Sequence, residues 1–238
     1  MSNIALILGG GSGSRMRQEI PKQFLTINDC PVIIYTLETF QRHPEIDAIA
    51  VVCLEGWENV LKAYARQFGI TKLKHVIAGG KNAHGSAENG VFELEKHYNA
   101  DDIILIHDGN RPLVSAEIIS NCIVTVNRYG GCATPVIDCT EAMLVTEDGA
   151  TSSSIYPRDK IKRGQTPNGF YLGKICELYR RAKNANIDDS RGPSLLMMKL
   201  GERINLFAGS EKNFKITTIE DMEIFQALLE AQKPKWLK

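Results

Sequence analysis

The sequence predicts an α/β protein in which a mostly parallel sheet lies between two layers of helices. Continuous apolar runs of strand length at residues 4–8, 48–53, 75–78 and 103–106 are typical of strands buried on both faces. A stretch with helical spacing follows each run. This alternation of strand and helix favours a Rossmann-like three-layer fold, and the chain length suits a single domain over residues 1–238.

Start and stop signals place the helices along the chain. Pro31 suits the first turn of a helix, Ser115 suits a cap, and Gly69 ends a helical pattern. The predicted helices cover residues 32–40, 57–68, 86–98, 116–128 and 171–182, with a last helix from residue 217. Late strands are expected at 204–208 and 214–217, and the polar segment 188–193 is expected to be a turn or loop.

The first predicted strand leads directly into a glycine-rich loop at residues 9–13. Four glycines in five positions allow a sharp turn and let backbone N–H groups approach a ligand closely, as in anion-binding loops. Arg15 and Lys22 add two positive charges nearby. Backbone donors and two cations together favour a polyphosphate ligand, although a glycine-rich surface turn with two solvated cations is an alternative for the loop taken alone.

Two familiar glycine motifs do not fit this loop. The dinucleotide fingerprint needs a third glycine where the sequence has Met16. A Walker A loop ends in Gly-Lys-Ser/Thr, whereas this loop ends in Gly13, Ser14 and Arg15. The broken fingerprint argues against a nicotinamide-dependent reductase.

Three chemistry-bearing loops follow predicted strands and are expected to meet. They cover residues 9–15, 79–86 and 107–112. In open parallel sheets, ligands bind beyond the carboxyl ends of the strands. The sequence therefore predicts one ligand site at that edge of the sheet.

Composition limits the possible partners and compartment. The 28 lysines and arginines balance the 28 aspartates and glutamates, so no overall field would recruit nucleic acid or an anionic membrane. The chain has no apolar stretch of membrane-spanning length and no signal-peptide pattern after Met1, which favours a cytoplasmic protein. Six widely spaced cysteines are expected to be reduced and buried, and they do not suggest a zinc site.

The motifs resemble those of a family of cytidylyltransferases that act on 2-C-methyl-D-erythritol 4-phosphate or ribitol 5-phosphate. The resemblance starts with residues 8–16 and Pro-Lys-Gln-Phe-Leu at 21–25. Further blocks follow in the family's order at residues 78–80 with Ser86, 107–112, 135–138, 164–167 and 213–217. The resemblance covers nearly the whole chain, and it implies a nucleotidyltransferase fold with a protruding β-arm at 137–160.

The resemblance implies transfer of a cytidylyl group from CTP to a small polyol phosphate, with Mg²⁺ as cofactor. Arg15 and Lys22 match the catalytic cations that neutralise the triphosphate, and Asp108 matches the metal ligand. The nucleotide-binding positions by resemblance are Leu8, Gly9, Gly10, Gly11, Gly13, Gly80, Ser86 and Asp108. The acceptor-binding positions are Gly109, Arg111, Arg158, Thr166 and Lys215.

Several of these positions have structural alternatives. Asp108 could cap the following turn, Ser86 could be a plain helix N-cap, and Arg111 and Arg158 could be salt-bridge residues. The family commonly has an arginine where this chain has Ala83. His107 is expected to be a packing residue at the end of its strand.

The acceptor and the assembly are the remaining expectations. Features at Trp57, 69–70, 156–158 and 164–167 resemble the ribitol 5-phosphate branch, which makes a precursor of a teichoic acid or capsule polymer. Methylerythritol 4-phosphate, used in isoprenoid synthesis, is the alternative acceptor. By resemblance, the arm at 137–160 crosses to a second subunit and Arg158 serves the partner's site, which implies a homodimer. A non-catalytic nucleotide-binding dimer is the alternative of another class.

Overall fold

A sheet of eight strands forms the middle layer of the computed structural model, which describes residues 1–11, 20–187 and 192–232. The strands of this sheet are β1 (Asn3–Gly9), β4 (Ala48–Cys53), β5 (Leu73–Ala78), β6 (Ile103–Asp108), β7 (Cys132–Asp138), β10 (Lys162–Gly164), β11 (Asn168–Tyr171) and β12 (Ile204–Ala208). The α/β class expected from the sequence is confirmed.

The strand order is β5-β4-β1-β6-β11-β7-β12. Strands β5, β4, β1 and β6 pair in parallel, β11 runs antiparallel between β6 and β7, and β12 pairs in parallel with β7. Val136 of β7 pairs with Gly164 of β10 and with Ala208 of β12, so β10 lies on the same side of β7 as β11. The carboxyl ends of six strands therefore share one edge of the sheet.

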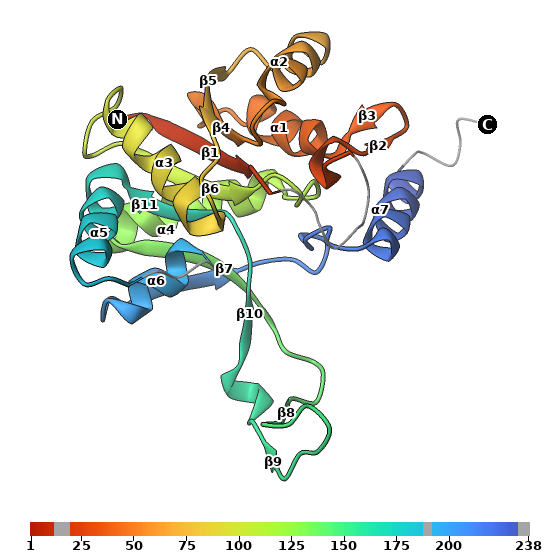
Figure 1. Cartoon of the computed structure of the whole chain (residues 1–238), viewed down its shortest axis with the longest axis vertical. Helices are drawn as coiled ribbons and strands as arrows, with labels where there is room; N and C mark the ends of the chain where they lie inside the picture. Colours follow the sequence, from red (N-terminus) through yellow and green to blue (C-terminus); the bar gives the residue numbers. More distant parts are fainter. Residues whose placement is uncertain (12–19, 188–191, 233–238) are drawn as a thin grey trace.

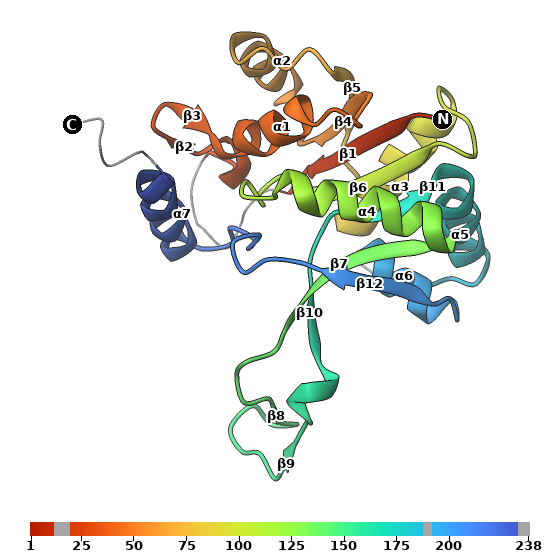
Figure 2. The ribbon, with the colours of Figure 1, turned by 180° about the vertical axis from the view of Figure 1, so that it is seen from behind.

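Helices cover both faces of the sheet (Figures 1 and 2). One face packs against α1 (Val32–Arg42), α2 (Glu58–Gln67) and α4 (Ala116–Tyr129). The other face packs against α3 (Ala83–Glu95), α5 (Leu172–Asn184) and α6 (Pro193–Lys199). Strand β6 supplies Ile103 and Leu105 to the first layer and Ile104 and Ile106 to the second. This alternation explains its continuous apolar sequence, because both of its faces are buried.

The predicted boundaries agree best where a cap or a buried run defines them. Strand β4 covers the expected residues 48–53, and the Ser115 hydroxyl accepts a hydrogen bond of 3.2 Å from the Ile118 N–H at the start of α4. The helix expected from residue 86 begins instead at Ala83, because the Asn82 side chain caps it by accepting from the Gly85 N–H at 2.7 Å.

The strand expected at 214–217 in the later chain is wrong. Residues 214–217 form no strand; this segment instead makes isolated hydrogen bonds, among them one from the Ile216 N–H to the Asn110 carbonyl. A boundary also differs: helix α6 begins at Pro193, the last residue of the segment expected to be a loop, because proline is well suited to the first helical position, and Gly192 before it is in neither helix nor strand. The preceding residues 188–191 lie outside the described part of the chain.

A β-arm leaves the body between β7 and β10 and projects far from the sheet (Figure 1). Its outer part is a short hairpin of β8 (Leu144–Val145) and β9 (Ser154–Ile155), followed by the single turn η3 (Arg158–Lys160). At the base of the arm, Arg163 and Glu211 form an ion pair. The protruding arm that the resemblance implied at 137–160 is therefore present.

A smaller cluster holds the C-terminal helix beside the N-terminal region. Helix α7 (Ile219–Gln232) packs Phe225 against residues near β2 (Thr26–Ile27) and β3 (Cys30–Pro31). All six cysteines are buried with free thiols, as expected. Among the described residues, no helix is long and apolar enough to cross a membrane.

Helix α3 lies unusually close to the sheet at Gly90. A Cβ atom there would lie 2.7 Å from Leu6 and 2.9 Å from Val52, and both of these side chains are fully buried. We expect Gly90→Ala to lower the unfolding free energy by about 1 kcal/mol, because overpacking outweighs the gain in helix propensity. Urea denaturation measures this change.

Gly85→Ala is the matched control in the same helix. A Cβ atom at Gly85 would make an ordinary contact of 3.5 Å with Asn82, so this substitution should raise stability by about 0.5–1 kcal/mol. Equal stabilities for the two variants would contradict the close packing at Gly90.

Candidate active site

Two adjoining cavities open at the carboxyl edge of the sheet, beside β1. The first, of about 400 Å³, is lined by the glycine loop, Lys22 and the start of α3. The second, of about 310 Å³, is lined by the start of α6 and by residues 164–166. Leu8, Ala83, Asp108 and Lys215 line both cavities. The strand order reverses at β1, and such a point is where open α/β sheets bind ligands.

Gln23 holds the described part of the glycine loop in place. It lies in the single turn η2 (Lys22–Phe24), and its side chain is buried. Its amide nitrogen donates hydrogen bonds to the carbonyl groups of Gly9, at 2.6 Å, and Gly11, at 3.1 Å. The Pro-Lys-Gln-Phe motif therefore positions the loop as well as bringing Lys22 to the first cavity.

The turn from β5 into α3 forms the opposite wall of the first cavity. Ser86 lies inside α3, and its hydroxyl accepts a 3.0 Å hydrogen bond from the Gly80 N–H, so the expectation of a plain N-cap is wrong. A Cβ atom at Gly80 would overlap the backbone of Gly85, and one at Gly10 would press on the Ser86 hydroxyl at 3.2 Å. Glycine is thus required where these two loops approach each other.

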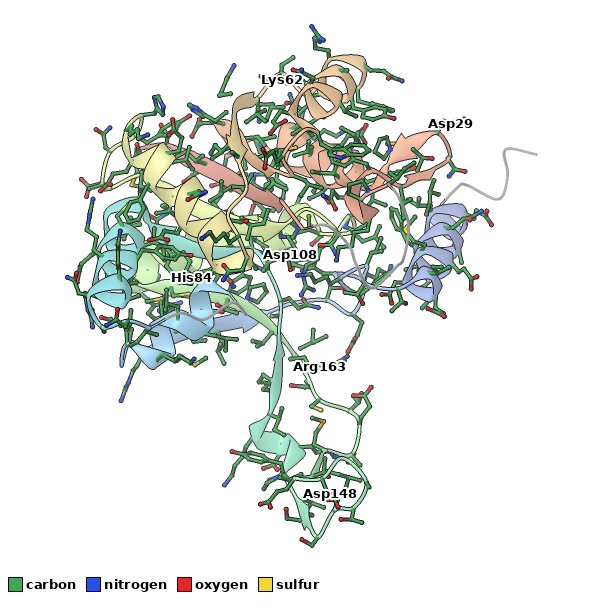
Figure 3. All side chains as sticks on the ribbon, viewed as in Figure 1. Asp29, Lys62, His84, Asp108, Asp148 and Arg163 are labelled. Atoms are coloured by element: carbon green, nitrogen blue, oxygen red, sulfur yellow. The ribbon has the colours of Figure 1, made fainter. Side chains whose placement is uncertain are left out.

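Asp108, at the end of β6, lies between two cations where the cavities meet (Figure 3). The Arg111 Nε is 2.9 Å from one carboxylate oxygen and the Lys215 Nζ is 2.8 Å from the other. Burial acts to raise the pKa of Asp108, but the charges and hydrogen bonds of Lys215 and Arg111 outweigh it and hold the pKa well below its usual range. The carboxylate is therefore ionised.

A buried hydrogen-bond network fixes the segment that carries Lys215. The Arg111 guanidinium donates at 2.7 Å to the carbonyl group of Asn213, whose side chain donates at 2.8 Å to the carbonyl group of Thr166. Asn110 ties the next turn by donating to the Ile216 carbonyl and accepting from the Ile216 N–H. These contacts hold the segment in place without strand pairing, and they position Lys215 so that its side chain reaches Asp108.

His107 precedes Asp108 and is fully buried, as a packing residue would be. Its ring lies against Phe40, its Nε2 is 3.2 Å from the Arg111 carbonyl oxygen, and its Nδ1 is 3.0 Å from the Thr166 hydroxyl. The same hydroxyl accepts a 3.1 Å hydrogen bond from the Asp108 N–H. Burial lowers the pKa of His107 to about 4, against a smaller opposing effect of Asp108.

The structure brings together most of the residues that the sequence assigned to the nucleotide. Leu8, Gly9, Gly10, Gly11, Lys22, Gly80, Ser86 and Asp108 all line the first cavity. Gly13 and Arg15 lie outside the described residues. The roles given to these residues stay predictions, because a nucleotide contact is tested only by binding or kinetics.

The acceptor positions are more dispersed. Arg111, Thr166 and Lys215 line the second cavity. Gly109 is buried against β1, where its N–H donates to the Leu8 carbonyl at 3.0 Å, and it lines neither cavity. Arg158 lies on the exposed arm and donates to the Thr140 carbonyl at 3.2 Å, so within one protomer it lines neither cavity.

Several lining residues were not predicted from the sequence. Lys81 and Asn110 line the first cavity, and His84, labelled in Figure 3, lines the second. The His84 ring meets the Tyr179 ring edge-on. Lys81 and His84 lie inside the predicted 79–86 loop, so that motif pointed to the right place. No sequence signal pointed to Tyr179, because it lies on a helix whose apolar residues have the spacing of ordinary core residues.

Metal binding would depend on Asp108. It is the only carboxylate among the described residues that line the two cavities. Within the described part of the chain, no group of three or more His, Cys, Asp or Glu residues is placed to hold a metal ion. A single carboxylate suits Mg²⁺, which commonly takes one or two carboxylates and completes its shell with water and substrate phosphates.

The fold is that of the nucleotidyltransferases with a mostly parallel α/β sheet. A crystal structure of 4-diphosphocytidyl-2C-methyl-D-erythritol synthase from Anaerococcus prevotii superposes with a TM-score of 0.81 at 23% identity, covering 96% of each chain. The 2-C-methyl-D-erythritol 4-phosphate cytidylyltransferase of Thermus thermophilus gives a TM-score of 0.75 at 23% identity, covering 94% of this chain and 98% of that one. At these identities the likeness shows the fold.

The sequence comparisons define the family. The model of the 2-C-methyl-D-erythritol 4-phosphate cytidylyltransferase family (IspD) matches residues 3–231, and the chain belongs to this family. A ribitol-5-phosphate cytidylyltransferase of Lacticaseibacillus paracasei is 40% identical over 94% of this chain and 97% of its own length. A 2-C-methyl-D-erythritol 4-phosphate cytidylyltransferase of Clostridium botulinum is 33% identical over 96% and 97%.

The buried His107 makes stability depend on pH. The unfolded chain binds a proton at this histidine near pH 6.5 and the folded chain only near pH 4, so acid favours unfolding between these values. The difference corresponds to about 3 kcal/mol of unfolding free energy. Between pH 7 and pH 4, the unfolding free energy of His107→Gln should fall by about 3 kcal/mol less than that of the unmodified protein. Urea denaturation at the two pH values measures this difference.

The charged groups near His107 do not reverse this loss of stability at low pH. Asp108 stays ionised throughout the range because Lys215 and Arg111 hold its pKa low. Parallel stability curves for the two proteins would show that His107 is not protonated on unfolding in this range.

Proposed function

We propose that this protein transfers the cytidylyl group of CTP to a small polyol phosphate, with D-ribitol 5-phosphate as the acceptor. The observation that carries the proposal is the meeting of two cavities at the ion pair of Asp108 and Lys215. One cavity carries the glycine loop that suits a nucleotide triphosphate, and the other has room for a small second substrate. The products are a CDP-alditol and pyrophosphate.

The reaction is an in-line displacement at phosphorus. A phosphate oxygen of the acceptor attacks the α-phosphorus of CTP, and the bond to the pyrophosphate leaving group breaks. Such reactions depend on positioning and on stabilising negative charge. Lys22 from η2 and Lys215 line the first cavity and supply positive charge there, and Arg15 matches a second catalytic cation of the family.

Arg111 and Lys215 bring their charges to the boundary of the two cavities through Asp108. Both cations are within hydrogen-bond distance of its carboxylate, so their positions are fixed before any substrate arrives. Preorganised charges of this kind lose little energy to reorganisation during the reaction. We propose that they receive the acceptor phosphate next to the α-phosphorus.

Mg²⁺ is the proposed cofactor, and Asp108 is the residue that would hold it. The bound ion would neutralise phosphate charge and polarise the phosphorus for attack. The charged side chains paired with Asp108, Arg111 and Lys215, are cations, so they would contact the phosphates and not the metal.

Ribitol 5-phosphate is favoured over methylerythritol 4-phosphate by the relatives. Proteins named ribitol-5-phosphate cytidylyltransferase from L. paracasei and Vibrio parahaemolyticus are 40% and 36% identical to this chain. The methylerythritol enzymes of Clostridium botulinum and Clostridium acetobutylicum are 33% and 34% identical. The CDP-ribitol product would serve as a precursor of a teichoic acid or capsule polymer, and CTP as substrate favours a cytoplasmic location.

We also propose that the protein works as a homodimer joined by the arm. The hairpin of the arm exposes apolar side chains, with 63% of Leu144, 77% of Ile155 and 56% of Tyr156 accessible. A contiguous apolar surface on a protruding hairpin is typical of a protein interface. In that arrangement Arg158, which follows the hairpin, would serve the acceptor site of the partner subunit.

Pyrophosphate release from CTP and Mg²⁺ tests the proposed reaction. We expect ribitol 5-phosphate to give a kcat/KM at least about 10-fold above methylerythritol 4-phosphate, xylitol 5-phosphate and arabinitol 5-phosphate. A preference for methylerythritol 4-phosphate would move the protein to isoprenoid synthesis. CTP binding without release, for any acceptor, would indicate a non-catalytic nucleotide-binding protein.

The Lys22→Ala variant checks the mechanism in the same assay. We expect kcat to fall by about 100-fold or more, because a charge next to the triphosphate is lost. Lys62→Ala on the surface of α2, away from both cavities, is the matched control and should keep full activity (Figure 3). Undiminished turnover by the Lys22 variant would refute its assigned role.

Charged substitutions in the arm test the proposed dimer. We expect Leu144→Glu combined with Ile155→Glu to convert a dimer to a monomer at micromolar concentration, because burying two carboxylates in an apolar interface is unfavourable. Light scattering after size-exclusion chromatography measures the mass. If Arg158 acts across the interface, turnover should fall as the dimer is lost.

Ala150→Glu combined with Ser153→Glu is the control for charge alone. Both residues are exposed in the same hairpin, between β8 and β9. A monomeric unmodified protein, or an arm variant that stays dimeric, would refute the arm as the dimer contact.

A further inference from the structure

The hydrogen bonds of His107 define which of its nitrogens carries a proton. Its Nε2 lies 3.2 Å from the backbone carbonyl oxygen of Arg111, and a carbonyl group can only accept. Nε2 therefore carries the hydrogen. The imidazole is fully buried against Phe40, the charges that act on it include the cations Arg111 and Lys215 as well as Asp108, and such a site favours the neutral ring. In a neutral ring Nδ1 is then an acceptor.

This arrangement determines the direction of the hydrogen bond to Thr166. The Thr166 hydroxyl oxygen is 3.0 Å from the His107 Nδ1, so the hydroxyl donates its single hydrogen to the ring. The same oxygen accepts the Asp108 N–H at 3.1 Å. A hydroxyl has one hydrogen and two lone pairs. One lone pair is left.

Thr166 lines the second cavity, so a polyol bound there lies within reach of its side chain. Its side chain lines the cavity and is partly exposed, at the junction between β10 and β11. A lone pair accepts a hydrogen bond from a substrate hydroxyl and repels a phosphate oxygen. The groups that can donate to a phosphate, Arg111 and Lys215, line the same cavity.

We propose that His107 is a positioning residue that makes Thr166 an obligate hydrogen-bond acceptor for a hydroxyl group of the polyol. This inference rests on the proposed function and adds the basis of acceptor recognition to it. Arg111 and Lys215 receive the phosphate end of the acceptor, and Thr166 recognises its polyol end. A phosphorylated compound without a hydroxyl at that position would bind poorly.

Analogues of ribitol 5-phosphate test the direction of this hydrogen bond. Each hydroxyl is replaced in turn by hydrogen or by fluorine, which can accept weakly but cannot donate. At the position that faces Thr166, both replacements should lower kcat/KM by about 10- to 100-fold through the KM of the acceptor, with the KM of CTP unchanged. A fluorinated analogue as good as ribitol 5-phosphate at every position would overturn the proposal.

Substitutions identify Thr166 as the recognising group. In Thr166→Val the penalty of the sensitive deoxy and fluoro analogues should fall to about 3-fold or less, because the partner is gone. Thr166→Ser keeps the hydroxyl and should restore the discrimination. Discrimination by the valine variant equal to that of the unmodified protein would overturn the proposal.

His107→Gln tests the positioning role. Its amide can still donate to the Arg111 carbonyl but offers no acceptor where Nδ1 was, so the Thr166 hydroxyl is free to turn and donate. The fluoro analogue should then recover at least about 5-fold relative to ribitol 5-phosphate. His43→Gln is the matched control, because His43 is also buried with its Nε2 3.2 Å from a backbone carbonyl and 3.0 Å from a hydroxyl.

The control variant should keep the discrimination of the unmodified protein. A His107 variant that behaves like the His43 variant would overturn the positioning role. Failure of the unmodified protein to release pyrophosphate with ribitol 5-phosphate would instead refute the proposed function itself.

Discussion

The site depends on one carboxylate at the end of a central strand. Strand β6 is buried on both faces, so its last residue, Asp108, is held rigidly at the edge of the sheet. Its two oxygens are bound by Arg111 from the turn that follows and by Lys215 from a segment more than a hundred residues later. Removing the carboxylate would leave two cations repelling each other beside the two cavities. The ion pairs thus assemble a cationic site before the polyanion arrives.

The glycines around the first cavity are constrained by close packing between two loops. The loops after β1 and β5 approach so closely that side chains at Gly10 and Gly80 would strike Ser86 or the backbone of α3. The Ser86 hydroxyl bonds the Gly80 N–H across this contact, and Gln23 secures the other loop through two carbonyl groups. Both loops are thereby held at fixed positions around the first cavity.

Much of this arrangement could be predicted from local sequence. Buried strands such as 48–53 are defined by their own apolar run, and α4 is defined by the cap at Ser115, so these elements lie where expected. The convergence of the loops after β1, β5 and β6 followed from the rule for parallel sheets. The contacts that long-range structure determines could not be foreseen. The segment at 214–217 has a strand-like composition, yet its hydrogen bonds go to the Asn110 turn.

His107 and Gly109 also show what local sequence could not predict. Both lie in a motif that marks the site, but Gly109 is used for close packing on β1 and His107 turns away from the cavity toward Thr166. Motif membership therefore indicates a region, while burial and hydrogen-bond direction decide which residue faces the ligand. The distinction between donor and acceptor at Thr166 depends on the contact of His107 with a backbone carbonyl, which has no signature in sequence.

The two cavities have walls from different elements, which suggests how one family can use different acceptors. The walls of the first cavity come from the loops after β1 and β5, and in the proposed function they hold the nucleotide. The second cavity is walled by side chains from separate elements, among them His84 of α3, Tyr179 of α5 and Thr166 between β10 and β11. Changes there can alter which polyol is recognised without moving Asp108 or its cations. Under the proposed function, the hydrogen-bond donors and acceptors of this wall determine which polyol is accepted, while Asp108, Arg111 and Lys215 keep their arrangement.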